Sequence, residues 1–151
     1  MEMTFAALAQ RVGATIGVSP WILIDQDRID RFAAVTGDHG FIHVDPVAAA
    51  ATPFGTTIAH GLLVLSLTGL MAQQALPAIS DRAFLMNYGY DKVRMIAPVP
   101  CGTEVRGHFR LDRVSTRAEK QRLMHYTVTI ERAGSDRPVL VADWLLMVVV
   151  T

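Results

Sequence analysis

The sequence lacks an excess of charge of either sign, because 14 Lys and Arg residues balance 14 Asp and Glu residues. It therefore has no basic stripe of the kind with which nucleic-acid-binding proteins contact phosphates. It is also poor in cysteine. Cys101 is the single one and has no partner for an internal disulfide, a zinc site or a CxxC redox motif. We expect a cytoplasmic protein that binds no nucleic acid.

Long hydrophobic runs are also missing. The two longest apolar stretches, Leu62–Met71 and Val139–Val150, are shorter than the roughly 20 residues of a membrane-spanning helix, and Asp143 interrupts the second. The first residues, Met1–Phe5, lack the basic and apolar regions of a secretory signal peptide. We expect no signal peptide and no membrane partner.

The sequence is nevertheless apolar, with 51% hydrophobic and 19% charged residues in a chain of 151. This length and composition predict a single globular domain over residues 1–151, with no linker or internal repeat. An apolar excess in a small domain indicates an oligomer or an apolar ligand channel.

The first third of the chain has the pattern of short, capped helices. Thr4–Val12 is amphipathic with Thr4 as its N-cap, and Trp21–Ile24 is a short strand. Asp25 can cap the following helix, which Gly37 ends as a C-terminal glycine. Asp45, which precedes a proline, is expected to cap another short helix rather than to act in catalysis.

The remainder changes from helix to strand. Leu62–Ala72 is apolar nearly all the way round, which predicts a helix buried on every side. The strands that follow are rich in branched and aromatic residues: Phe84–Ala97, Glu104–Val114, Met124–Arg132 and Val139–Val150. This order predicts an α+β fold with an antiparallel sheet wrapped on a central helix. The last stretch is expected to be a central strand covered on both faces.

Asp38 and His43 lie on either side of Gly40, just beyond a predicted helix end. Adding water to a conjugated thioester requires a base, an acid and donors for the enolate oxygen. A carboxylate and an imidazole that hold one water can supply the first two. Gly61 opens the apolar helix, so its amide is a free donor. The Ser66 hydroxyl inside that helix needs a partner, either a carbonyl one turn back or the Asp/His pair.

These residues belong to a longer motif: Phe32-x-x-x-Thr36-Gly37-Asp38-x-x-x-x-His43-x-Asp45-Pro46, then Pro53-Phe54-Gly55-Thr56-Thr57-Ile58-Ala59-His60-Gly61, then Ser66. The motif resembles the MaoC-like dehydratases, the (R)-specific enoyl-CoA hydratases of the hotdog superfamily. The stretch Asn87–Arg94 with Ala97-Pro98-Val99 is similar to the nodulation-protein-N-like branch. The resemblance covers nearly the whole chain.

The resemblance implies a hotdog fold, in which a curled antiparallel sheet wraps a long buried helix. It also implies dimers that join two sheets, with an active site near the dimer interface. Asp38 and His43 become the catalytic dyad, Gly61 the oxyanion amide and Ser66 a supporting hydroxyl. One departure is Gly40-Phe41, where many relatives carry Asn-Pro, and this affects substrate range more than reaction type.

Four further residues are candidates for the site. Asn87 lies in a β-rich run and is either a substrate or supporting contact or a turn residue. His60 either shapes the site or is a packed residue at a helix start. Lys92 and Arg94 alternate onto one strand face, where they either meet coenzyme A phosphates or are ordinary exposed cations.

Of the other histidines, His108 and His125 are expected to be structural, and His39 is expected to neighbour the dyad but point elsewhere. Asp38, His43 and His60 are suitable metal-ligand types, but no close His spacing supports a site, so we expect no metal.

The leading hypothesis is a cytoplasmic homodimer, or an oligomer of dimers, of fatty acid metabolism. It would interconvert a trans-2-enoyl-CoA and an (R)-3-hydroxyacyl-CoA with no cofactor other than the coenzyme A thioester itself. Asp38 would take the proton of the water, and His43 would help deliver one to the α-carbon. Two alternatives stay open: a thioesterase of the same fold, and a non-catalytic acyl-binding subunit.

Overall fold

The computed structural model describes residues 2–151; Met1, the first residue of the expected domain, lies outside the described residues. Within that range a curled sheet contains six strands: β2 (Thr15–Val18), β3 (Ile22–Ile24), β5 (Arg82–Met95), β6 (Thr103–Ala118), β7 (Gln121–Arg132) and β8 (Leu140–Val150). The strand order is β2-β6-β7-β8-β5, with β3 also paired to β6, and all of these pairings are antiparallel. β5 therefore forms one edge of the sheet.

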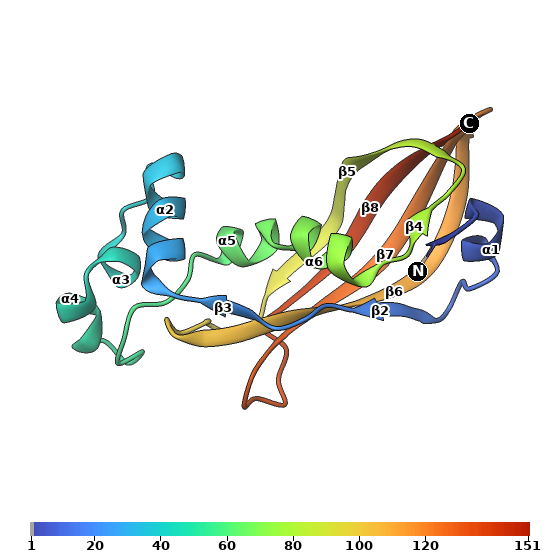
Figure 1. Ribbon diagram of the computed structural model, residues 1–151. Helices are drawn as coiled ribbons and strands as arrows, with labels where there is room; N and C mark the ends of the chain where they lie inside the picture. The colour runs from blue at the N-terminus through green and yellow to red at the C-terminus, as the bar shows by residue number, and fades with distance from the viewer. Residues whose placement is uncertain (1) are drawn as a thin grey trace.

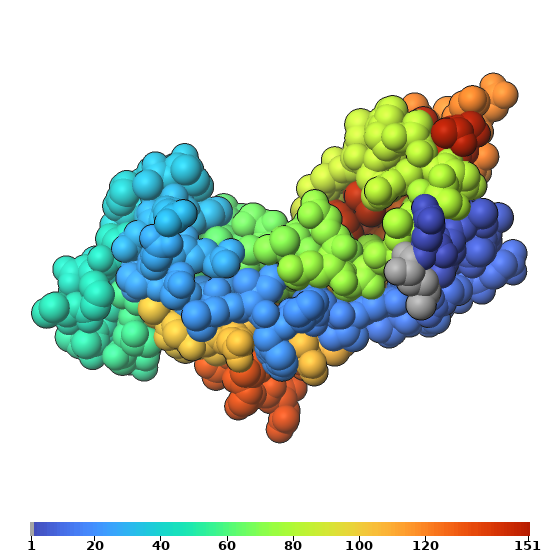
Figure 2. Space-filling model, viewed as in Figure 1, coloured from blue at the N-terminus to red at the C-terminus, as the bar shows by residue number. Residues whose placement is uncertain are grey.

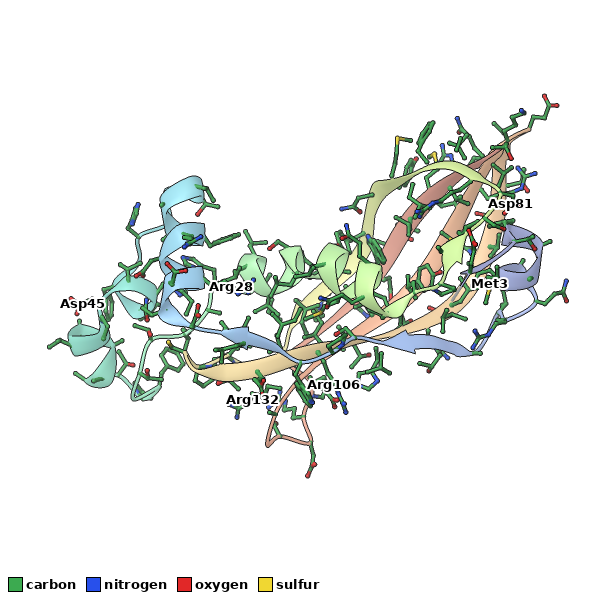
Figure 3. The ribbon with its side chains drawn as sticks, in the orientation of Figure 1. Met3, Arg28, Asp45, Asp81, Arg106 and Arg132 are labelled. Carbon is green, nitrogen blue, oxygen red and sulfur yellow. The ribbon has the colours of Figure 1, made fainter. Side chains whose placement is uncertain are left out.

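Two helices, α5 (Gly61–Ser66) and α6 (Thr68–Ala75), follow each other along one face of the sheet (Figure 1). Three helices gather beyond the start of α5: α2 (Gln26–Thr36), α3 (Phe41–Val44) and α4 (Pro46–Ala50). At the opposite end lie α1 (Phe5–Ala9) and the parallel pair β1 (Glu2–Met3) and β4 (Ala78–Ile79). Figure 3 shows this separation, with Asp45 at one end and Asp81 at the other.

The predicted helix caps are confirmed. The side chains of Thr4, Asp25 and Asp45 accept hydrogen bonds from backbone amides in the first turns of α1, α2 and α4. Gly37 closes α2 in the left-handed region, with φ of 78°. The first helix is shorter than predicted and ends at Ala9.

The prediction of one apolar helix buried on every side is wrong in two respects. The helix is interrupted at Leu67, which separates α5 from α6. Just before this break, the Ser66 hydroxyl donates to the Leu63 carbonyl oxygen at 2.7 Å, a contact that commonly bends helices. Burial is also one-sided, since Leu62 is 61% exposed and Leu70 38% exposed. A single sheet covers only one side of a helix, and Figure 2 shows the other side at the floor of a hollow.

The four predicted strands are confirmed, and β6 and β7 are longer than expected because they form one hairpin around residues 119–120. β8 lies between β7 and β5, as expected of a central strand. Its Trp144 packs in the core with Phe109 and Tyr126, at ring-centroid distances of 6.1 and 5.9 Å. On the other face Leu145 and Met147 are also buried, in a small second cluster.

Three short strands were not predicted: β1, β2 and β4. β1 and β4 span two residues each, too few for an alternating pattern to be visible in the sequence. No helix within residues 2–151 has both the length and the apolar character needed to cross a bilayer.

Candidate active site

Two chain segments meet at the start of α5 to form the candidate site. The first runs from the end of α2 through the irregular residues 37–40 into α3, and carries Asp38 and His43. The second is the extended stretch that leads into α5 and carries His60 and Gly61. A backbone hydrogen bond of 3.0 Å from the Ile58 amide to the Ile42 carbonyl oxygen joins the two segments.

The meeting segments enclose a small cavity of about 170 Å³. Its lining contains the predicted dyad together with residues of α2, α5 and β5: Phe32, Thr36, Asp38, His43, His60, Gly61, Leu62 and Met95. One side-chain donor atom from each of Asp38, His43 and His60 lies within 4.8 Å of the other two. Two groups that each hydrogen-bond the same water at about 2.8 Å are themselves roughly 4–5 Å apart. The Asp38–His43 separation therefore suits a shared water.

The two dyad side chains are held differently. Asp38 is 60% exposed, and its Oδ1 accepts a 3.3 Å hydrogen bond from the Gly40 amide. His43 is half-buried, and its Nδ1 lies 2.7 Å from the Ile58 carbonyl oxygen. Since a carbonyl oxygen only accepts, Nδ1 carries the hydrogen. Nε2 of the neutral ring consequently keeps its lone pair free.

His60 lies behind the dyad. It is 3% exposed, and its Nε2 lies 2.9 Å from the Asp38 carbonyl oxygen. Its ring stacks on His43 at a centroid distance of 3.9 Å and an interplanar angle of 24°. Phe32 contacts the same ring at 5.0 Å.

Asp38, His43 and His60 also form the one group of potential metal ligands found in residues 2–151. The hydrogen-bond pattern limits this use. His60 Nε2 donates to a carbonyl oxygen and so offers no lone pair, and the other ring nitrogen, Nδ1, is buried. The stacked rings have nearly parallel planes, whereas ligating nitrogens must direct their in-plane lone pairs at one ion. The arrangement suits proton transfer better than metal binding.

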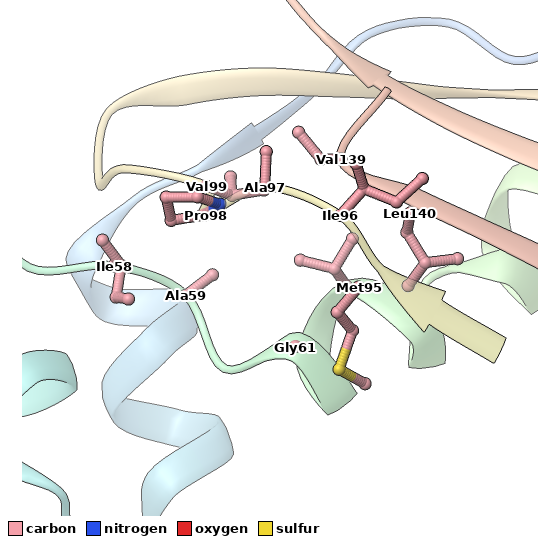
Figure 4. A pocket seen from close by; sticks show the side chains of 11 residues that line it. Ile58, Ala59, Gly61, Met95, Ile96, Ala97, Pro98, Val99, Val139 and Leu140 are labelled. Carbon is pink, nitrogen blue, oxygen red and sulfur yellow. The ribbon is translucent and has the colours of Figure 1, made fainter. Parts of the chain in front are cut away.

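Gly61 forms the boundary between this cavity and a neighbouring apolar cavity of about 250 Å³ (Figure 4). Met95 lines both cavities and reaches from the end of β5 toward Gly61. A Cβ atom built on Gly61 would lie 2.4 Å from the Met95 sulfur. Only glycine therefore lets the sulfur pack this closely on the start of α5. Met95 was not among the predicted site residues, because a methionine at a strand end carries no distinctive signal in the sequence.

The other predicted site residues do not line the dyad cavity. The Ser66 hydroxyl bonds to the Leu63 carbonyl oxygen, the first of its two expected partners. Asn87 accepts a 2.8 Å hydrogen bond from Trp144 Nε1 and lines a separate cavity of about 330 Å³ beside α6. Lys92 and Arg94 are exposed on β5.

The two histidines expected to be structural, His108 and His125, lie on the sheet, away from the dyad cavity. His108 Nε2 lies 2.9 Å from Glu131 Oε1. Hydrogen bonds from His108 and Arg106 hold the pKa of the Glu131 carboxyl below its usual value. His125 contacts Arg113, and partial burial together with that positive charge lowers the pKa of the His125 ring.

These features define a class of protein: an α+β fold in which helices lie against a curled antiparallel sheet, with an Asp/His pair facing the first amide of the central helix. The family model described as "MaoC like domain" matches residues 7–133. The chain belongs to the MaoC-like dehydratase family, and its fold is the hotdog fold of that family.

The chain is similar to several known members. It is 43% identical over 148 residues to nodulation protein N of Rhizobium leguminosarum bv. viciae, covering 97% of this chain and 92% of that protein. It is 41% identical over 138 residues to 3-hydroxyacyl-thioester dehydratase Z of Mycobacterium tuberculosis, covering 91% of each. An (R)-hydratase structure from A. caviae, involved in PHA biosynthesis, superposes with a TM-score of 0.71 at 26% identity, covering 91% of this chain and 98% of that one.

Proposed function

We propose that this protein is a hydro-lyase that reversibly adds water to a trans-2-enoyl thioester, forming an (R)-3-hydroxyacyl thioester. The observation that carries the proposal is the joint placement of Asp38, His43 and Gly61 around one small cavity. The similarity to a 3-hydroxyacyl-thioester dehydratase and to an (R)-hydratase supports the same reaction type.

The hydrogen bond of His43 suggests how the proton moves. Its Nδ1 hydrogen is directed at the Ile58 carbonyl, so the free lone pair on Nε2 can accept a proton from a water held in the cavity. The oxygen of that water would bond to the β-carbon, and His43 would return the same proton to the α-carbon. Asp38 would accept a hydrogen bond from the other O–H of the water and so orient it, and this hydrogen would stay on the product hydroxyl. The assignment first expected from the sequence, in which Asp38 takes the proton of the water, is the alternative within the same dyad.

Gly61 would stabilise the charge that develops on the thioester oxygen. Its amide belongs to the first residue of α5 and so has no partner within the helix. A backbone donor in a fixed position at a developing enolate lowers the barrier without reorganisation.

The reaction consists of proton transfers and one C–O bond, so it requires no metal and no cofactor. We propose coenzyme A as the thioester carrier. Lys92 and Arg94 are both exposed on β5, the strand that also brings Met95 to the dyad cavity. They are therefore the candidates for contact with its phosphates.

We also propose that the protein is a homodimer. The outward side of α5 and α6 carries exposed leucines, and β5 is an edge strand with exposed Phe84, Met86 and Tyr88. An apolar helix face and a free strand edge beside each other are features that a second copy can cover.

The decisive experiment measures hydration of short trans-2-enoyl-CoA substrates, with chiral analysis of the product. We expect wild-type protein to form the R product. Asp38→Asn and His43→Ala should each lower the rate by roughly 10²–10⁴-fold while keeping the fold, as expected for loss of a proton-transfer group. Asp143→Asn and His125→Ala, on the sheet, are matched controls that should keep the rate.

Four outcomes would contradict the proposal. Full activity in both the Asp38 and the His43 variant would rule out a catalytic role for this pair. An S product would contradict the stereochemistry expected of the family. Release of free thiol from an acyl-CoA, without loss of enoyl absorbance, would favour a thioesterase. Binding of acyl-CoA without turnover at any chain length would favour an acyl-binding subunit.

A further inference from the structure

His60 is the one histidine of the chain that is almost fully buried, with 3% of its surface exposed. It immediately precedes α5, and its ring contacts the rings of Phe32 and His43. A buried polar ring is normally bonded through both nitrogens. Here Nε2 is bonded to the Asp38 carbonyl oxygen, whereas Nδ1 is buried without a hydrogen-bond partner among residues 2–151.

Because one ring nitrogen has no partner, hydrogen bonding of the ring itself does not explain a histidine at this position. Its two contacts, with Asp38 and with His43, are the better explanation. An apolar side chain would fill the same space without leaving a buried nitrogen unpaired, which costs about 1–3 kcal/mol. The contacts that a replacement would lose are the hydrogen bond to Asp38 and the stack on His43.

The position of Asp38 depends mainly on its hydrogen bond with His60. Residues 37–40 form no helix or strand, and the Asp38 side chain is 60% exposed. The local hydrogen bonds of Asp38 itself are long, at 3.4 Å from the Asp38 amide to Thr36 Oγ1 and 3.3 Å from the Gly40 amide to Asp38 Oδ1. The 2.9 Å bond from His60 is shorter and ties the turn to the start of α5.

His43 depends on the same ring. The bond to the Ile58 carbonyl fixes one atom of the imidazole but leaves rotation about that contact. The flat stack on His60, at 3.9 Å and 24°, restricts the plane of the ring and so the direction of Nε2. One residue thus contacts both members of the dyad, on the side away from solvent.

From these contacts we propose that His60 is a positioning residue, which sets the separation of Asp38 and His43 so that both bind the same water. The inference rests on the proposed hydration. Because His60 lies behind the dyad, its replacement should lower kcat and leave the KM of the enoyl thioester nearly unchanged. A displacement of about 1 Å in reacting groups commonly costs around 10²-fold in rate.

The test uses three substitutions that separate the two contacts. His60→Gln keeps an N–H donor and loses the stack, His60→Phe keeps a stacking ring and loses the donor, and His60→Leu loses both. We expect kcat to fall about 10-fold in each of the first two and about 10²-fold in the third, with KM within about twofold. Ile130→Ala, a buried substitution on β7, is the control for lost stability alone and should keep kcat.

A second readout does not depend on turnover. In two-dimensional NMR spectra, His60→Leu should shift the Asp38 amide and His43 ring signals, whereas Ile130→Ala should not. If wild-type protein turned over no enoyl thioester but these shifts occurred, the proposed reaction would fail and the positioning role would stand. Unchanged signals, unchanged kcat in the Gln and Phe variants, or an effect confined to KM would each overturn the inference.

Discussion

Gly61 and Met95 pack together where the start of α5, beside the dyad, meets the end of β5. The sulfur of Met95 occupies the space in which any Cβ at position 61 would lie, at 2.4 Å from it. A side chain at position 61 would therefore require the Met95 side chain to move.

A double-mutant cycle tests this packing. Gly61→Ala should destabilise the protein by about 1 kcal/mol, a modest cost because a flexible side chain can move away. In a Met95→Ala background the same substitution should cost close to nothing. Urea unfolding of the four proteins gives the coupling free energy, and additive costs would contradict the proposed contact.

At the scale of elements, the arrangement depends on how closely α6 approaches β2. A Cβ atom on Gly17 of β2 would lie 2.1 Å from the Ala75 carbonyl oxygen near the end of α6. That oxygen is part of the backbone, so it cannot move without displacing the helix. The contact fixes the far end of the helix pair over the sheet, while Gly61 and Met95 fix the near end.

Gly17→Ala should consequently lower the free energy of unfolding by about 2–3 kcal/mol, at the upper end of the usual cost of overpacking. Gly69→Ala is the matched control, since a Cβ on this helical glycine meets no atom within 4 Å. It should be neutral or stabilise the protein by up to about 1 kcal/mol through helix propensity. Thermal and urea unfolding measure both, and equal effects would show that α6 does not pack tightly on β2.

At the scale of the whole molecule, the unpaired side of the α5–α6 helices determines the expected assembly. Figure 2 shows α5 and α6 at the floor of a hollow between α2 and β5. Leu70 of α6 is 38% exposed. Leu23 on β3 is exposed to a similar extent, at 46%, but lies on a different element of the molecule.

Leu70→Asp should therefore weaken the homodimer, because a carboxylate in an apolar interface costs about 3 kcal/mol or more, or roughly 100-fold in dissociation constant. Leu23→Asp should leave it unchanged. Sedimentation or light scattering over a range of protein concentrations compares the two. A monomeric wild-type protein, or an equal response to both substitutions, would contradict the dimer proposed on this face.

The sequence by itself determined the features whose partners are close in the chain. The capping side chains of Thr4, Asp25 and Asp45 accept hydrogen bonds from amides two or three residues away. The end of α2 at Gly37 depends only on the ability of that glycine to adopt a positive φ. The long strands follow from residue type along each strand. The dyad spacing was also visible, because one turn and one short helix connect Asp38 to His43.

Only the tertiary structure decided the contacts between distant segments. The bond from His60 to Asp38 spans 22 residues, and the placement of Met95 on Gly61 joins a strand end to a helix start. No local pattern encodes such pairs, since they depend on how the sheet curls around the helices. The same reason explains why the helix predicted over Leu62–Ala72 is not buried on every side. The apolar pattern of the sequence predicts how much helix surface should be buried. Only the folded chain shows that the sheet buries one side of α5 and α6 and leaves the other side exposed.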